Sequence, residues 1–173
     1  MRLGLLLRLV GSVAAQQSLD EQALRAFFDA TGGTAAWRRS SGWATDVTSP
    51  CSWYGVSCVD NAVDEVDVSG NDLDGTLPAL FFAQPPPNLK RLDLAGNSIA
   101  GTIPTEWGPN ELQDVRLSST TLSGTLPAAA FGADRLVKLD IGRTSISGTI
   151  MVRAGGRVTL KHVSSWSANN FAL

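Results

Sequence analysis

The sequence predicts an α/β repeat solenoid, in which each turn of a coil carries a short β-strand and a helical cap covers the first turn. An apolar pattern recurs four times between residues 63 and 151, and each unit carries a glycine at the same place. An amphipathic segment with the spacing of a short helix precedes the first unit. Because a repeat cannot bury its own end, this helix is expected to cover the first coil.

The length and composition favour one globular domain without nucleic acid as a partner. A chain of 173 residues fits one folded unit, since domains typically have roughly 100–200 residues. Charged residues make up 17% and the net charge is -2, so there is no basic excess to bind phosphates. No stretch approaches the roughly 20 apolar residues that span a bilayer. We therefore expect a monomer with no membrane span.

Residues 1–15 have the pattern of a secretory signal peptide. Arg2 is followed by an apolar stretch over residues 3–13, and small side chains precede a cleavage point before Gln16. Arg8 interrupts the apolar stretch, which leaves a different start site open. The pattern predicts a chain that is secreted or displayed at the cell surface, where disulfides persist.

Residues 16–62 are predicted to form an amino-terminal cap. Ser18 stands three residues before Glu21, the spacing of a capping box that opens a helix. Apolar side chains then recur at spacings of three and four, and two glycines follow as a stop signal. A short amphipathic helix is therefore expected over residues 19–30. Its apolar face consists of Leu24, Phe27 and Phe28.

The two cysteines of the chain, Cys51 and Cys58, lie close together in the cap. In a secreted chain an oxidised pair is expected, and closing so short a loop contributes roughly 2–3 kcal/mol in the chain-entropy model. In a reducing compartment the two residues would instead be buried thiols. A metal site is disfavoured, because two thiolates and the single His162 do not complete the usual four-ligand set.

Residues 63–151 are predicted to form four repeats. These start at Val63, Leu89, Leu112 and Leu136, so the spacings are 26, 23 and 24 residues. All three spacings fall inside the window of about 20–29 residues that is typical of leucine-rich repeats. Each unit has an apolar triplet that is expected to point into the coil, followed by a polar residue at a turn.

The polar turn position is predicted to satisfy backbone groups inside each coil. Asn71 and Asn97 offer both donors and acceptors there, and the hydroxyls of Thr120 and Thr144 can do part of the same work. The Gly-Thr-Leu/Ile-Pro segment that follows predicts a tight turn and then a second short extended stretch, which ends at the proline.

Two segments depart from the repeat. The first unit carries prolines at positions 85–87, which resist helix and predict a short polyproline II bend that serves as a rigid connector. A ligand for a proline-reading domain is the alternative. Residues 152–173 are predicted to be a partial or degenerate fifth repeat. The residues that suggest it are Ser164, Trp166, Asn169, Asn170 and Phe171.

Taken together, these residues resemble the plant-type leucine-rich repeat family, whose pattern runs Leu-x-x-Leu-x-Leu-x-x-Asn-x-Leu-x-Gly-x-Ile-Pro. The segment before the repeats is similar to the cysteine-containing cap of that family. Its sequence motif is similar to versions seen in algal, stramenopile and bacterial members as well as in plants. The resemblance covers residues 18–171. The matching cap residues are Trp37, Gly42, Trp43, Pro50, Cys51, Trp53, Tyr54, Gly55, Val56 and Cys58.

The resemblance implies a right-handed coil with short parallel strands on its concave face and a Cys51–Cys58 disulfide in the cap. It also implies that a protein, a peptide or a cell-wall glycan binds on the concave face, as in receptor-kinase ectodomains and polygalacturonase inhibitors. The sequence has no kinase, no transmembrane segment and no carboxy-terminal cap. A fragment of a longer receptor, or a shortened gene model, would account for these departures.

The candidate binding residues occupy columns on the first strand of each repeat. Because parallel strands lie about 4.8 Å apart, oppositely charged neighbours in a column come within ion-pair reach. The columns are Glu65, Arg91, Asp114 and Lys138, then Asp67, Asp93, Arg116 and Asp140, then the small residues Ser69, Ala95, Ser118 and Gly142. A ladder of charges that satisfy one another is the alternative to a ligand site, each exposed pair contributing at most about 1 kcal/mol.

A column of threonines suggests a second function. Thr76, Thr102, Thr125 and Thr149 occupy the same place in the four repeats. A row of threonines at strand spacing is similar to the arrangement in ice-binding solenoids, some of which are built on leucine-rich repeats. The competing explanation is that an exposed strand position favours threonine.

The sequence offers no credible catalytic site, so we expect neither an enzyme nor a cofactor. Catalysis through imidazole would have to use His162, which lies in the least regular part of the chain. A carboxylate pair from Asp93 and Asp140 would lie on an open, wet face where nothing raises one pKa. The sequence therefore predicts an extracellular recognition module, with a structural or ice-binding protein as the alternative.

Overall fold

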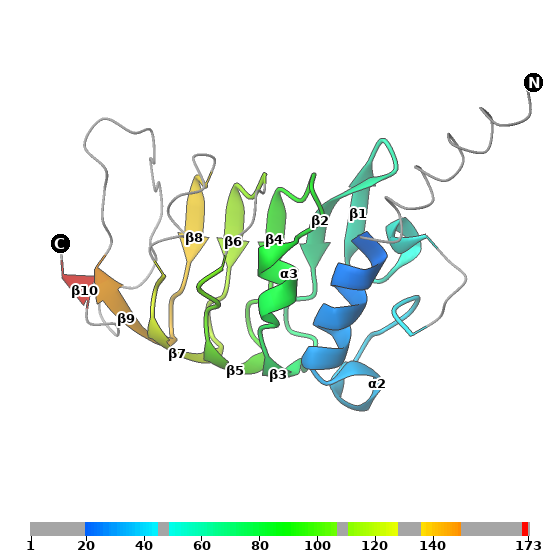
Figure 1. Ribbon diagram of the computed structural model, residues 1–173. Helices are drawn as coiled ribbons and strands as arrows, with labels where there is room; N and C mark the ends of the chain where they lie inside the picture. Colours follow the sequence, from blue (N-terminus) through cyan, green and yellow to red (C-terminus); the bar gives the residue numbers. More distant parts are fainter. Residues whose placement is uncertain (1–19, 45–48, 107–110, 128–135, 150–170, 173) are drawn as a thin grey trace, which may run out of the picture.

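The computed structural model describes residues 20–44, 49–106, 111–127, 136–149 and 171–172, and it shows the predicted solenoid with its helical cap (Figure 1). Two five-stranded sheets run along the coil. The first sheet has the order β1-β2-β4-β6-β8, and the second has the order β10-β9-β7-β5-β3. Each repeat thus contributes one strand to each sheet, because the chain passes from the first sheet to the second within every turn of the coil.

The first sheet contains the predicted strands of the apolar triplets. β1 pairs with β2 in an antiparallel hairpin whose turn residues, Asp60 and Asn61, both have positive φ, as tight hairpin turns require. The remaining strands are parallel and keep the register of the repeats. The strands are β1 Val56–Val59, β2 Ala62–Asp67, β4 Arg91–Asp93, β6 Asp114–Arg116 and β8 Lys138–Asp140.

The strands of the second sheet lie earlier in each repeat than the sequence predicts. The extended stretch was expected after the Gly-Thr pair, but the strands end at that threonine, and the glycine lies inside each strand with positive φ. The Leu/Ile-Pro pair therefore follows the strand. The strands are β3 Asp74–Thr76, β5 Ser98–Thr102, β7 Thr121–Thr125, β9 Ser145–Thr149 and β10 Phe171–Ala172.

The core lies between the two sheets. The middle residue of each of the strands β4, β6 and β8 points inward. Leu92 and Val115 are fully buried, as is Ile99 from the second sheet. Cutting such a leucine back to alanine typically costs about 2–5 kcal/mol, because a cavity remains. The alternation of inward apolar and outward polar side chains on β4, β6 and β8 leaves their charged residues on the outer surface.

The polar turn position works as the sequence predicts. Asn97 donates to the carbonyls of Val68 and Leu94 and accepts from the backbone N–H groups of Asn71 and Leu73, so it joins two coils. Thr120 donates to the carbonyl of Leu117 in its own coil, and among the described residues its side chain makes no hydrogen bond to a neighbouring coil. A hydroxyl therefore replaces part of what the amide does.

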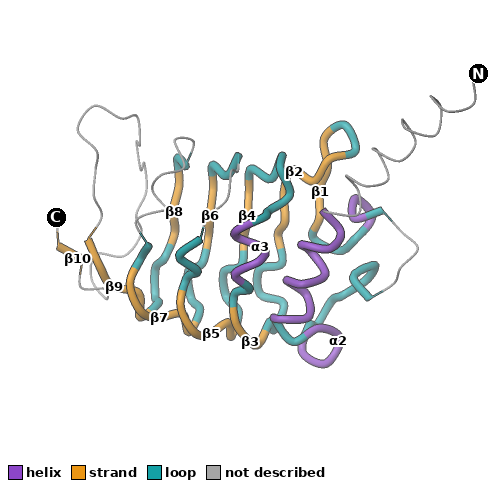
Figure 2. Tube along the Cα trace, in the orientation of Figure 1, coloured by secondary structure: helices purple, strands orange, loops and turns teal. Residues whose placement is uncertain are grey.

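The cap contains the predicted helix, which covers residues 20–30 within the described part of the chain (Figure 2). Leu24, Phe27 and Phe28 are buried, as expected from their spacing. They join an aromatic cluster in which the ring centroids of Phe28 and Trp37 are 4.9 Å apart and those of Trp43 and Trp53 are 5.1 Å apart. Two short elements complete the cap, α2 Gly33–Ala36 and the 3-10 helix η1 Pro50–Ser52.

A short helix that the sequence did not predict follows β3. Helix α3, Ala79–Ala83, buries Phe81 and Phe82 at 1% exposure each. The ring centroid of Phe81 lies 5.2 Å from that of Phe27, so α3 packs against the cap helix. The prolines of residues 85–87 follow α3 and connect it to β4.

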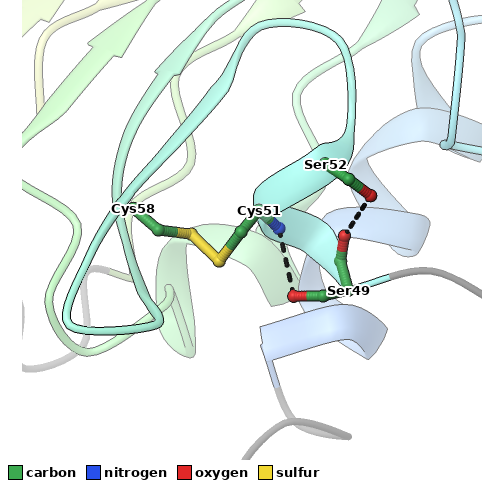
Figure 3. Close-up of a disulfide and its surroundings, with 4 residues drawn as sticks. All are labelled: Ser49, Cys51, Ser52 and Cys58. Carbon is green, nitrogen blue, oxygen red and sulfur yellow. Dashed lines mark hydrogen bonds between the residues drawn. A yellow bond between two sulfur atoms is a disulfide. The ribbon is translucent and has the colours of Figure 1, made fainter.

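The cysteines form the disulfide, and the alternative of two free thiols is wrong (Figure 3). Cys51 in η1 and Cys58 in β1 have their Cα atoms 5.5 Å apart. Ser49 begins the η1 turn by accepting the backbone N–H of Cys51 on its hydroxyl, and the Ser52 hydroxyl donates to the Ser49 carbonyl. Within the cap, the disulfide therefore fastens η1 to β1, the edge strand of the first sheet.

Several predicted features lie outside the described residues. These are the signal peptide, Ser18 of the capping box, His162, and residues 150–170, which include the end of the fourth repeat and most of the predicted fifth. At the carboxy-terminal side, β10 pairs in parallel with β9, with Phe171 beside Gly148. The boundaries of the signal peptide, cap and repeats stay predictions.

Candidate recognition surface

The first sheet brings the two predicted charged columns together. The register pairs Glu65 with Arg91, Arg91 with Asp114, and Asp114 with Lys138. The second column runs in the same register beside the first, separated by the inward-pointing residues of the core. We call this surface the charged face. It consists of Glu65, Asp67, Arg91, Asp93, Asp114, Arg116, Lys138 and Asp140.

Arg91 is surrounded by four carboxylates of the charged face. Its guanidinium lies 2.8 Å from Glu65, 3.4 Å from Asp93, 3.7 Å from Asp67 and 4.0 Å from Asp114. The Nε atom is buried without a hydrogen-bond partner, since Asp114 is too distant for a hydrogen bond. One cation thus holds carboxylates from three neighbouring strands.

Arg116 provides the second centre of the network. Its Nη2 donates to Asp114 at 2.9 Å, and its Nη1 donates to Asp93 on the neighbouring strand at 3.2 Å. The hydrogen bond to Asp114 is the main cause that raises the pKa of Arg116, so the guanidinium stays charged. Lys138 adds an ammonium group 3.8 Å from Asp114.

The aspartates of the second column also have a structural role that the sequence analysis missed. In Asp67, Asp93 and Asp140 the Oδ1 atom accepts the backbone N–H of the residue two positions later, each at 3.1 Å. This short-range bond is typical of aspartate at a turn, and it ends the strand in three of the four repeats. The sequence signal that could have revealed this role is the small residue two positions after each of these aspartates. The second oxygen of Asp93 contacts Arg91 and Arg116, and that of Asp67 lies 3.7 Å from Arg91.

The charged face carries an excess of negative charge. Five carboxylates face three cations, so the eight residues sum to -2. The side chain of Asp93 is only 6% exposed and is held between two guanidinium groups, whereas that of Asp67 is 39% exposed. The least accessible carboxylate of the face therefore lies in the middle of the sheet, whereas Asp67 on β2 and Asp140 on β8 are half-buried.

The third predicted column borders the charges with small side chains. Ser69 is exposed, Ala95 and Ser118 are half-buried, and Gly142 is buried. Such small residues leave the strand ends open to a ligand that approaches the aspartates. On the other side of the charges, Lys90 forms an ion pair with Asp64.

The threonine column does not form the row that was predicted. The second sheet pairs Thr76 with Ala100 and Thr102 with Ser123, so each strand is offset by two residues from the repeat register. Neighbouring hydroxyls are also engaged by the sheet itself, since Ser123 donates to the carbonyl of Gly101. The expected side-by-side alignment of the threonines is therefore wrong: Thr102 lies beside Ser123 and Thr125 beside Ser147.

Within the described ranges, no group of three or more histidine, cysteine, aspartate or glutamate side chains is placed to hold a metal ion. The helices in this part of the chain are all too short or too polar to cross a membrane.

Comparisons with known proteins agree with the fold and the cap. The model of the leucine rich repeat N-terminal domain matches residues 18–59, and that of the leucine rich repeat matches residues 88–110. The rice brassinosteroid LRR receptor kinase BRL3 is 36% identical over 153 residues, which are 83% of this chain and 12% of that protein. The chain thus spans about an eighth of the length of this curated relative.

Solved structures of plant receptor ectodomains superpose on the chain. The BIR2 ectodomain from Arabidopsis thaliana is 28% identical with a TM-score of 0.64, covering 76% of this chain and 70% of that one. The ectodomain of the Arabidopsis receptor kinase HAESA, in complex with an IDA peptide hormone, is 25% identical with a TM-score of 0.58, covering 91% of this chain and 30% of that one.

The matched region corresponds to ectodomains, and it does not include the kinase domains of these relatives. The apolar register, the disulfide-bonded cap and the two matching family models lead to one assignment. The chain is a plant-type leucine-rich repeat protein with a leucine-rich repeat N-terminal cap, similar to the ectodomains of receptor kinases.

Proposed function

We propose that this chain is a non-catalytic, extracellular recognition module that binds a protein or peptide through the charged face. The observation that carries the proposal is the ion-pair network centred on Arg91 and Arg116, which presents a fixed pattern of charge on an open sheet. Such a pattern selects partners by complementarity, because a partner with like charge opposite each group is repelled.

The extracellular location is supported by the disulfide and by the likeness to receptor ectodomains. The binding of a peptide or protein is supported by the HAESA ectodomain, whose structure holds a peptide hormone. A cell-wall glycan is the other ligand class that the sequence suggests. The charge of the face favours a peptide with basic side chains over an acidic polysaccharide, because the eight groups sum to -2.

The structure also suggests where such a ligand would lie. Asp67 offers an accessible carboxylate oxygen, and the small residues Ser69 and Ala95 leave room beside it. A basic side chain at this place would reduce the net charge of the face from -2 to -1. Arg116 marks the opposite end of this region, where a carboxylate of the ligand would meet a guanidinium that Asp93 and Asp114 already hold in place.

The test is a binding screen in which the purified chain is presented with two arrays. One contains extended peptides of graded net charge, and the other contains cell-wall oligosaccharides that include oligogalacturonides. The substitutions Asp67→Asn and Arg116→Gln are expected to weaken binding of the selected peptides by roughly tenfold. Arg38→Gln serves as the control, because Arg38 forms an exposed ion pair with Asp72 away from the charged face. Equal binding by all three variants would contradict the proposal, as would selection of acidic oligosaccharides alone.

A further inference from the structure

A groove lies between the cap helix and α3, away from the charged face. It has a volume of about 280 Å³. Its lining residues come from the first turn of the cap helix and from α3 with the prolines that follow. Figure 1 shows these two helices side by side. Apolar contact surface comes from Ala23, Leu80, Pro85 and Pro87. None of the lining residues belongs to the charged face, so the groove is a separate feature.

Leu80 gives the groove an exposed apolar side. Its neighbours Phe81 and Phe82 are buried, whereas Leu80 is 51% exposed on the outer side of α3. The fold does not need this side chain for its core, since the buried face of α3 is complete without it. A partner that covered Leu80 would remove apolar surface from water, which is favourable for binding.

Asp20 places a carboxylate in the same groove. Within the described residues, no hydrogen bond or ion pair reaches this carboxylate, and burial raises its pKa. A carboxylate that is partly removed from water without a partner costs free energy, and a cation placed beside it would recover part of that cost. The side chains of Gln22 and Gln84 add neutral hydrogen-bonding groups at the rim.

We propose that this groove binds one arginine or lysine side chain of a partner protein, with its methylene stem against Leu80 and the prolines and its charged end at Asp20. Arginine and lysine fit this combination because they bury an apolar stem while the head remains hydrogen-bonded. An aromatic or aliphatic side chain would cover Leu80 equally well, but it would leave the carboxylate without a partner. An acidic side chain would be repelled.

The two glutamines explain how the partner backbone is accommodated. Gln22 and Gln84 stand on opposite walls of the groove, and each amide offers a donor and an acceptor. A partner residue that inserts its side chain between the two glutamines brings its own backbone N–H and carbonyl close to their amide groups. The groove therefore suits a segment that crosses the cap helix and α3 with a single basic residue pointing inward.

The experiment is an NMR titration of the full ¹⁵N-labelled chain with three small probes, of which the first two have nearly equal shape. The probes are N-acetyl-arginine methylamide, its uncharged analogue N-acetyl-citrulline methylamide, and N-acetyl-glutamate methylamide. We expect saturable shifts at the amides of Ala23, Leu80 and Gln84, with arginine binding roughly fivefold more tightly than citrulline, as one exposed ion pair allows. Glutamate is expected to cause no saturable shift there.

Two variants separate the charge from the apolar contact. Asp20→Asn should abolish the preference for arginine over citrulline, and Leu80→Ser should weaken both probes. The matched control is Asp29→Asn, since Asp29 is an exposed aspartate on the same helix that does not line the groove. Equal affinity for arginine and citrulline in the parent chain would overturn the proposal. Retention of the arginine preference in Asp20→Asn would overturn it as well. Either failure leaves binding at the charged face unaffected, because that face is tested by other variants.

Discussion

The side chain of Thr102 lies against Gly124 of the next coil, so closely that a Cβ added to Gly124 would stand 2.8 Å from Thr102 Cγ2. Thr76 lies over Gly101 in the same way, with a corresponding distance of 3.4 Å. The two-residue offset of the second sheet produces this contact, because it pairs each threonine with the residue directly before the glycine of the next coil. Thr76 pairs with Ala100, and Thr102 pairs with Ser123. The threonine of one repeat therefore packs against the glycine of the next repeat.

We expect Gly124→Ala to lower the free energy of unfolding by roughly 2–4 kcal/mol. The substitution meets the Thr102 methyl group and also places a side chain at φ +83°. Urea unfolding measures the loss. Gly70→Ala is the control, because Gly70 also has positive φ but has no atom within 4 Å of the added Cβ. The double variant Thr102→Ser with Gly124→Ala should recover the part of the lost free energy that comes from the clash, because serine lacks the Cγ2 methyl group. Equal losses for Gly124→Ala and Gly70→Ala would show that the contact with Thr102 is unimportant.

Ser119→Gly and Arg143→Gly are expected to stabilise the chain by roughly 0.5–1 kcal/mol each. These residues have φ of 55° and 54° at the turn position that Gly70 and Gly96 occupy in the first two repeats. Glycine avoids the left-handed strain of about 1–2 kcal/mol, and its greater freedom in the unfolded chain offsets part of the gain. Thermal unfolding checks the sign. Ser118→Gly, beside this position, should be destabilising; if it stabilised the chain as much, the strain at Ser119 would not be the cause.

Asn97→Ala should destabilise the chain far more than Thr120→Ala, although both residues occupy the same place in their repeats. Loss of the Asn97 carbonyl leaves the buried N–H groups of Asn71 and Leu73 without an acceptor, which we expect to cost roughly 2–4 kcal/mol. Thr120 makes one bond within its own coil, and its removal should cost about 1 kcal/mol. Chemical denaturation of the two variants measures the difference. Similar losses would contradict the bridging role of Asn97.

Asp20→Asn should raise the melting temperature at pH 7. Burial raises the pKa of Asp20 in the folded state, so the folded chain holds this proton more tightly than the unfolded chain, and the ionised carboxylate costs stability above the folded pKa. The gain from Asp20→Asn should shrink as the pH falls through that raised pKa, and it should vanish below the ordinary value of 3.8. Asp29→Asn controls for the loss of one negative charge. A gain that is constant with pH would exclude the burial of Asp20 as its cause.

Much of this structure follows from the spacing of residues along the chain. The apolar triplets limit the register of the first sheet, because a slip by one residue would turn all of them towards solvent. That register then places Glu65 beside Arg91 and Asp93 beside Arg116, as the columns predict. The cap helix was also predictable, since Leu24, Phe27 and Phe28 recur at helical spacing.

Other features depend on contacts between coils that no local pattern specifies. Helix α3 was missed because the residues Ala79–Ala83 are too few for a helical period to be recognised, and burial of Phe81 against the cap stabilises it. The groove at Leu80 and Asp20 exists only because α3 packs beside the cap helix. The sequence by itself determined the repeat, the cap and the charged columns, since these depend on side-chain periodicity. Only the tertiary structure decided the two-residue offset of the second sheet and the position of α3, because both depend on how neighbouring turns of the coil fit against one another.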